Sequence, residues 1–145
     1  YPELYLDVEF DDRRVNLHEE GFDAAVRIGE LPDSSLVAKI ITPNRHIICA
    51  SPDYLARCGT PTSLEALKAH RCIALHGMPF WSFVKQGEPV AIKAESAFSA
   101  NSVEAVRTAS QQGMGLAMLT YWDVRKALQV GSLVEVALED MLAVK

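Results

Sequence analysis

The sequence predicts an α/β fold in which helices cover a parallel or mixed sheet. Segments with the apolar alternation of half-buried strands take turns along the chain with segments that carry helix caps. The first unit is a strand at 6–10, a short helix at 18–20 that Gly21 ends, and a strand at 22–29. Because only a crossover joins parallel neighbours, this order indicates a parallel or mixed sheet.

Two further strands are expected at 36–41 and 46–50. A turn at 32–34, made of proline, aspartate and serine, comes before the first of them. The residues Thr-Pro-Asn-Arg at 42–45 separate the two strands, since proline and asparagine interrupt a strand.

Two short helices follow, each introduced by a serine. Ser51 is the expected N-cap of a helix at 52–58, which begins with proline and which Gly59 ends. Ser63 is the expected N-cap of the next helix, which leads into a strand at 71–75.

Residues 76–100 are rich in turn residues, and we expect short antiparallel strands at 81–84, 89–94 and 95–100. Three elements and a last strand complete the chain. They are a helix capped by Asn101 or Ser102 and ended by Gly113, a strand at 114–119, a helix at 121–128 capped by Thr120, and a strand at 132–138.

The composition is that of a soluble globular protein. Of 145 residues, 49% are hydrophobic and 23% are charged, far from the composition of disordered or membrane proteins. No apolar run approaches the roughly 20 residues of a membrane-spanning helix, and no signal-peptide pattern opens the chain. We therefore expect no contact with a membrane.

The net charge of −5 argues against direct binding of nucleic acid. Neutralising phosphates needs a positive field, which this chain lacks. If the parent protein binds DNA, we expect another segment to do so.

The three cysteines, Cys49, Cys58 and Cys72, include no CxxC pair, so their spacing suggests neither a disulfide framework nor a zinc site. A reducing cytoplasm is the simpler compartment, and we expect no metal and no cofactor. A redox role for Cys49 with Cys58 is the weaker alternative, since only accessible thiols of low pKa sense oxidants.

No catalytic constellation stands out in the sequence. It contains no GxSxG, no glycine-rich phosphate loop and no HExxH, and its four histidines lie in unlike surroundings. Asp11 and Asp12 could form a paired-carboxylate site, but adjacent residues of an extended chain point to opposite faces. A turn, or pairing with Arg13 or Arg14, is the favoured alternative. We therefore expect no catalytic residues.

The helix start at 100–102 is better suited to binding an anion than to catalysis. Unpaired amides and the positive end of the macrodipole attract negative charge there, and Asn101 and Ser102 can add hydrogen bonds. The alternative, which the sequence alone favours, is an ordinary N-cap that serves only the helix.

Three stretches together resemble the sensing domain of LysR-type bacterial transcription regulators. They are EGFDAAVRIGELPDSSLVAKII at 20–41, ICASPDYLARCGTP at 48–61 and LKAHRCIAL at 67–75. The run Asp-x-x-x-Arg-x-Gly from Asp23, the Pro-Asp-Ser-Ser-Leu at 32–36 and the Ser-Pro-x-Tyr-Leu at 51–55 have that family's order and spacing. Later pieces fit too: Trp81, the helix start at Asn101, the turn at 113–115 and Gly-Ser-Leu-Val at 131–134.

The resemblance implies a two-lobed α/β domain of the type II periplasmic-binding-protein kind, here with an incomplete first lobe. Residues 1–45 would form part of the first lobe and the first hinge, 46–136 the second lobe, and 137–145 a truncated return toward the first lobe. The family's sensing domain usually has further elements before Tyr1 and after Lys145.

The resemblance also implies a small organic effector, expected to be anionic, in the cleft between the lobes. The candidate effector-binding residues are Asp11, Asp12, Arg27, Asn101 and Ser102, with Phe80 or Trp81 as an apolar wall. Arg27 would pair with a carboxylate of the effector; a salt bridge to Asp23 or a neighbouring acid is the equal alternative.

For the parent protein, the resemblance implies a cytoplasmic regulator that associates into dimers or tetramers. It would bind operator DNA only through a winged helix-turn-helix region outside this chain, and the effector would act by shifting the populations of lobe arrangements. The two alternatives are a solute-binding protein of similar fold and a small α/β enzyme that uses Asp11 and Asp12.

Overall fold

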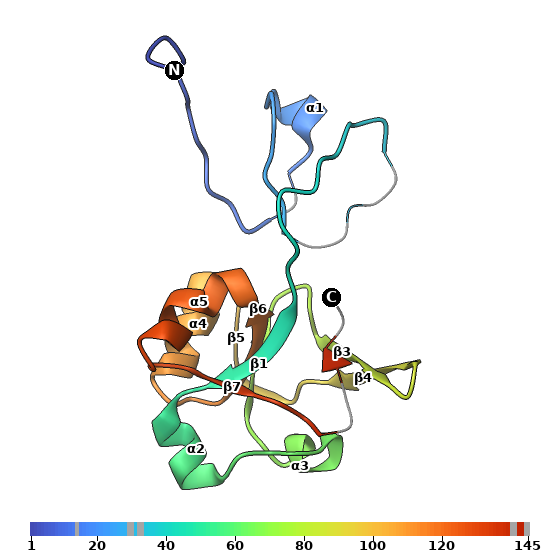
Figure 1. Ribbon diagram of the computed structural model, residues 1–145, viewed down its shortest axis with the longest axis vertical. Coiled ribbons are helices and arrows are strands. Elements are labelled where there is room, and N and C mark those ends of the chain that lie inside the picture. The colour runs from blue at the N-terminus through green and yellow to red at the C-terminus, as the bar shows by residue number, and fades with distance from the viewer. Residues whose placement is uncertain (14, 29–30, 32–33, 140–141, 144–145) are drawn as a thin grey trace.

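The computed structural model describes residues 1–13, 15–28, 31, 34–139 and 142–143 (Figure 1). It separates into an extended N-terminal segment, residues 1–45, and a sheet body that begins at His46. Part of the turn predicted at 32–34 and the end of the strand predicted at 22–29 lie outside the described residues, as does Arg14.

A five-stranded mixed sheet forms the centre of the sheet body, in the order β5-β2-β6-β1-β7. Strand β2 is parallel to β5 and β6, whereas β1 is antiparallel to β6 and β7. The strands are β1 His46–Ala50, β2 Cys72–Leu75, β5 Ser96–Ala100, β6 Leu116–Thr120 and β7 Val134–Val136. This confirms the predicted α/β class with a mixed sheet.

Both faces of the sheet are covered, so its central strand β6 is buried along its whole length. Helices α4 (Val103–Gln111) and α5 (Tyr121–Gln129) cover one face, where Ile47 and Cys49 of β1 pack. The alternate residues of β1, Ile48 and Ala50, point to the opposite face. There they belong to another group of buried apolar side chains, called the second cluster below, which also contains Trp81, Phe83 and Leu138. Helices α2 (Pro52–Cys58) and α3 (Leu64–Lys68) contribute Tyr54 and Leu67 to that cluster.

A small second sheet completes this opposite core. Strands β3 (Phe80–Lys85) and β4 (Glu88–Lys93) form the predicted antiparallel hairpin, and β8 (Leu142–Ala143) pairs with β3. The hairpin turns at Gln86 and Gly87, whose φ angles of 52° and 87° are both positive, as a two-residue turn between twisted strands requires.

The strand predicted at 95–100 exists, but its predicted antiparallel pairing is wrong. Strand β5 joins the main sheet parallel to β2, and the β3–β4 hairpin lies between them in the chain. The direction differs because the hairpin serves as the crossover that any parallel connection needs.

The helices predicted from caps are confirmed. The Ser51 and Ser63 hydroxyls accept hydrogen bonds from the amides of Tyr54 and Ala66, each at 3.2 Å, and Ser102 caps α4. Helix α1 (Leu17–Glu20) precedes Gly21, whose φ is +75°. These signals are local, so they act wherever the helix packs.

The strands predicted in the N-terminal segment are wrong. Residues 6–10, 22–28 and 36–41 form no strand in the part that the structure describes, and their apolar side chains lie exposed except for the half-buried Phe22; Phe10 is 93% and Val37 100% exposed. A strand needs a neighbour for its backbone hydrogen bonds. The sheet body offers these stretches none, so apolar alternation alone does not make them strands.

The resemblance predicts that residues 137–145 return toward the first lobe. The described residues of this range lie against the sheet body. Leu138 is buried in the second cluster, and the Glu139 amide donates to the Thr62 carbonyl at 2.9 Å. The pairing of β8 with β3 continues this course. The buried side chains of Leu133, Val136 and Leu138 therefore complete the core of the sheet body.

Among the described helices, none has the length and apolar character that crossing a bilayer would require.

Candidate functional site

One edge of the main sheet collects the ends of its parallel strands. Strands β2, β5 and β6 run in one direction and end there at Leu75, Ala100 and Thr120, and β1 begins there at His46, paired with Thr120. The N-terminal segment joins the sheet body at this edge (Figure 1). In open α/β sheets, ligands bind outside the carboxyl ends of the strands, so this carboxyl edge is the candidate site.

The start of α4 lies at the carboxyl edge and already holds a carboxylate. The Val103 amide donates to Oδ2 of Asp12 at 3.0 Å, across 91 positions of sequence. The Ser102 hydroxyl accepts from the Ala105 amide at 3.4 Å. The structure thus brings together Asp12 and the helix start at Ser102, two of the predicted site positions.

Asp11 lies next to Asp12 but has a different partner. Its carboxylate accepts from the Arg13 amide at 2.9 Å and from Arg13 Nε at 2.5 Å, and Arg13 also bonds Glu20 of α1 at 2.7 Å. The Arg13 amide and guanidinium lower the pKa of Asp11, and the Arg13 guanidinium lowers that of Glu20. Pairing with Arg13, the favoured alternative, is the arrangement observed.

His76 is a neighbour of the helix start that the sequence reasoning missed. It directly follows β2; its amide donates to the Ala100 carbonyl at 2.7 Å, and its Nε2 lies 3.3 Å from the Ser99 hydroxyl. Asn101 is exposed beside it. A histidine at the end of a predicted parallel strand was the signal that could have identified it.

Phe80 and Trp81 lie at the start of β3 and point in opposite directions, as neighbours in a strand do. Phe80 is 55% exposed, whereas Trp81 is 2% exposed and packs among the second cluster. Trp81 therefore serves the core of the sheet body and does not line an open cleft.

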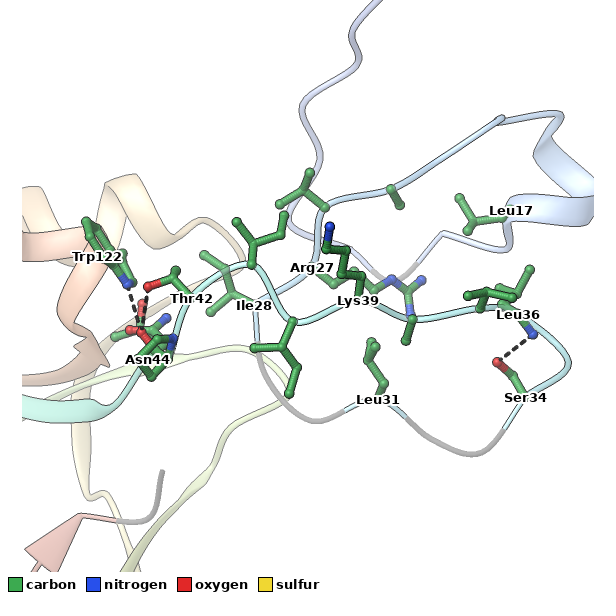
Figure 2. A pocket seen from close by; sticks show the side chains of 18 of the residues that line it. Leu17, Arg27, Ile28, Leu31, Ser34, Leu36, Lys39, Thr42, Asn44 and Trp122 are labelled. Atoms are coloured by element: carbon green, nitrogen blue, oxygen red, sulfur yellow. Dashed lines mark hydrogen bonds between the residues drawn. The ribbon is translucent and has the colours of Figure 1, made fainter.

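Arg27 lies on the wall of a cavity of about 990 Å³, which residues of the N-terminal segment line together with His46, Thr120 and Trp122 of the sheet body. Its guanidinium donates to the Val15 carbonyl. Figure 2 shows apolar side chains, including Ile28, Leu31 and Leu36, around the cavity, with Trp122 at one end. The lining is mostly apolar.

The connection between the N-terminal segment and the sheet body, residues 43–45, is bonded to the sheet body at several points. Arg45 bonds both carboxylate oxygens of Glu135 at 2.6 and 2.9 Å and lies 5.6 Å from the Tyr121 ring centre. The Trp122 indole donates to the Pro43 carbonyl at 3.1 Å. The bonds to Glu135 raise the pKa of Arg45, so the Arg45 guanidinium stays charged. Trp122 was not among the predicted residues.

The cysteines take no part in the carboxyl edge. Burial raises the pKa of the Cys49 thiol to about 12 and that of the Cys72 thiol to about 11, while Cys58 is exposed. Among the described residues, no three histidine, cysteine or acidic side chains gather as a metal site would need.

Comparison with known proteins gives the family. Residues 1–144 match the family model described as the LysR substrate binding domain. The chain is 35% identical over 140 residues to the HTH-type transcriptional regulator DmlR of Escherichia coli, covering 94% of this chain and 46% of that protein. It is 34% identical over 143 residues to the HTH-type transcriptional regulator CrgA of Neisseria meningitidis, covering 96% and 47%. The chain thus spans about half the length of these curated relatives.

Solved structures agree. The full-length structure of the Vibrio cholerae virulence activator AphB matches 99% of this chain and 49% of its own, with a TM-score of 0.85 and 30% identity. The CrgA regulatory domain matches 87% of this chain and 65% of its own, with a TM-score of 0.71 and 31% identity. The chain belongs to the LysR substrate-binding domain family, the two-lobed, type II periplasmic-binding-like α/β domains that bind the effectors of LysR-type transcription regulators.

Proposed function

We propose that the chain senses a small organic acid at the carboxyl edge, in a cleft between residues 1–45 and 46–136, taken as the two lobes. The contact between Asp12 and the Val103 amide carries this proposal. A carboxylate at that amide satisfies a donor that the helix leaves unpaired and lies at the positive end of the macrodipole. A ligand carboxylate has the same chemistry.

The neighbouring side chains give the acid further partners. Asn101 offers an amide, Ser102 a hydroxyl and His76 a ring nitrogen, all at or beside the ends of β2 and β5. Phe80 is exposed and supplies an apolar surface. A few polar groups that fix orientation beside apolar surface are typical of small-molecule sites. Arg27 remains a proposed cation of the first lobe.

In the parent protein, the acid would act by favouring one arrangement of the lobes over another. The connection at Pro43 and Arg45, which is bonded to the sheet body, would transmit that change between the lobes. We propose that the parent is a cytoplasmic dimer or tetramer, a sensor and not an enzyme. Its operator would be bound by a winged helix-turn-helix region outside these residues. The names of the relatives, HTH-type transcriptional regulators, support this reading.

Addition of a recognised acid should raise the melting temperature of the full-length protein, and Ser102→Ala should reduce that rise. A ligand at 100 times its Kd adds about 2.7 kcal/mol to the stability of the folded state. Loss of the hydroxyl should remove about 0.5–1.5 kcal/mol of binding free energy. The measurement is a thermal-shift screen of mono- and dicarboxylic acids and their neutral amides.

Ser63→Ala is the matched control, because Ser63 caps α3 as Ser102 caps α4. Each substitution should cost about 0.5–2 kcal/mol of basal stability. Only Ser102→Ala should diminish the rise that the acid produces. An equal rise in wild type and both variants would remove the α4 start from the site.

A further inference from the structure

Asp12 occupies the very amide at which the proposed function places the acid. Its Oδ2 accepts from the Val103 amide at 3.0 Å, and one N–H donor makes one good hydrogen bond at a time. A second carboxylate at the same amide would also repel the first at short range. An effector carboxylate and Asp12 therefore exclude each other there.

The loop that carries Asp12 is built to hold it in place. On one side of Asp12, Asp11 is bonded to Arg13, and Arg13 is bonded to Glu20 of α1. Glu20 also accepts from the Asn16 amide at 3.0 Å. These bonds link Asp11, Arg13, Asn16 and Glu20 into one unit, and Asp12 fastens that unit to α4 of the sheet body.

We propose that Asp12 is an internal competitor of the effector, an autoinhibitory contact that an acid must displace to bind. This inference rests on the proposed acid site. Because a ligand binds only the fraction of molecules whose site is vacant, occupancy by Asp12 weakens the apparent affinity in proportion. Displacement frees residues 11–20 from α4, so binding at the sheet body is converted into release of a unit of the N-terminal segment.

As a competitor, Asp12 has the opposite effect on acid binding to that of a residue that contacts the ligand. Loss of a contact would weaken binding of acids, whereas loss of a competitor strengthens it. Asp12→Ala removes the competing group, and Asp12→Asn keeps an oxygen acceptor but removes its charge, which weakens the hydrogen bond. Affinity for acids should therefore rise in the order wild type, Asp12→Asn, Asp12→Ala.

The first test is calorimetric titration of the full-length protein with succinate and benzoate, and with succinamide and benzamide as neutral counterparts. For an acid that binds, Asp12→Ala should lower the Kd about three- to tenfold. This range follows if Asp12 occupies the amide in about 70–90% of wild-type molecules, because the apparent affinity is proportional to the fraction of vacant sites. The neutral amides should show no such gain.

Glu104→Gln is the matched control. Glu104 lies in the first turn of α4, is exposed, and carries a carboxylate next to the same amide; its ion-pair partner is Arg107, at 3.8 Å. Any general effect of one lost negative charge appears in this variant as well. If Asp12 is a competitor, the increase in affinity for the acid in Asp12→Ala should exceed the increase in Glu104→Gln by at least about twofold.

Hydrogen exchange supplies a signature that altered stability alone would not produce. The acid should speed exchange in residues 11–20 of the wild type, because Asp12 is released, and slow it at 103–106. In Asp12→Ala, residues 11–20 should already exchange fast and should not respond to the acid.

The outcomes separate the inference from the proposed function. Equal or weaker acid binding in Asp12→Ala than in wild type would overturn the competitor role and leave the acid site in place. Failure of both acids to bind any variant, Asp12→Ala included, would overturn both for these acids. Tighter binding together with the exchange pattern would establish the autoinhibitory contact.

Discussion

Replacing Trp81 by alanine is expected to destabilise the sheet body by about 3–5 kcal/mol, the usual cost of deleting a large aromatic side chain from a core. Trp81 is only 2% exposed and is among the largest fully buried side chains of the described residues. It packs with Phe83 and Ile92 of the hairpin against the main sheet. The loss combines lost transfer free energy with the cavity that remains.

Urea unfolding followed by circular dichroism measures this effect as a lower midpoint at an unchanged slope. Phe80→Ala is the control, because Phe80 is the adjacent aromatic residue of β3 but is 55% exposed. It should cost less than about 1 kcal/mol. Equal losses in the two variants would mean that the indole of Trp81 is not buried as the structure places it.

Cys58 is expected to be alkylated at least about a hundredfold faster than either of the other two cysteines. Cys58 is exposed, whereas Cys49 and Cys72 are buried. Burial raises the pKa of Cys49 to about 12 and that of Cys72 to about 11. The thiolate is the reactive form, so the raised pKa keeps Cys49 and Cys72 in the unreactive thiol form at pH 8.

Iodoacetamide at pH 8, with peptide mass spectrometry over time, measures the three rates. In urea all three should react alike. The raised pKa of Cys49 also has a consequence for stability: the folded state holds this proton more tightly than the unfolded chain. That contribution is complete below about pH 9 and is lost as the pH rises toward 12. Fast alkylation of native Cys49 would contradict the buried thiol and would revive a redox role.

The elements of the sheet body could be predicted from the sequence because their signals are local. Ser51, Ser63 and Ser102 each bond an amide three residues on, and this needs no knowledge of the rest of the fold. The direction of β5 could not be predicted in this way, since strand partners are set by tertiary packing.

The N-terminal segment shows the limit of apolar patterns. Val26, Val37 and Ile40 lie in stretches with the composition of strands, yet all three side chains are exposed. Periodicity identifies a face that can be buried but does not supply the surface that buries it. The strand predictions failed for that reason.

The candidate site was partly accessible from the sequence. Resemblance pointed to both Asp12 and Ser102, but only the structure shows that Asp12 reaches the Val103 amide. Trp81 was assigned to a cleft because alternation in β3 does not say which face meets the core. His76 was missed because its role depends on the parallel pairing of β2 with β5.

The most direct test of the acid site is a crystal structure of the full-length protein with the acid that gives the largest thermal shift. We expect the ligand carboxylate about 3 Å from the Val103 amide, with Ser102 and His76 beside it and the Asp12 carboxylate displaced. An acid bound only in the cavity beside Arg27, with the contact between Asp12 and Val103 intact, would contradict this expectation.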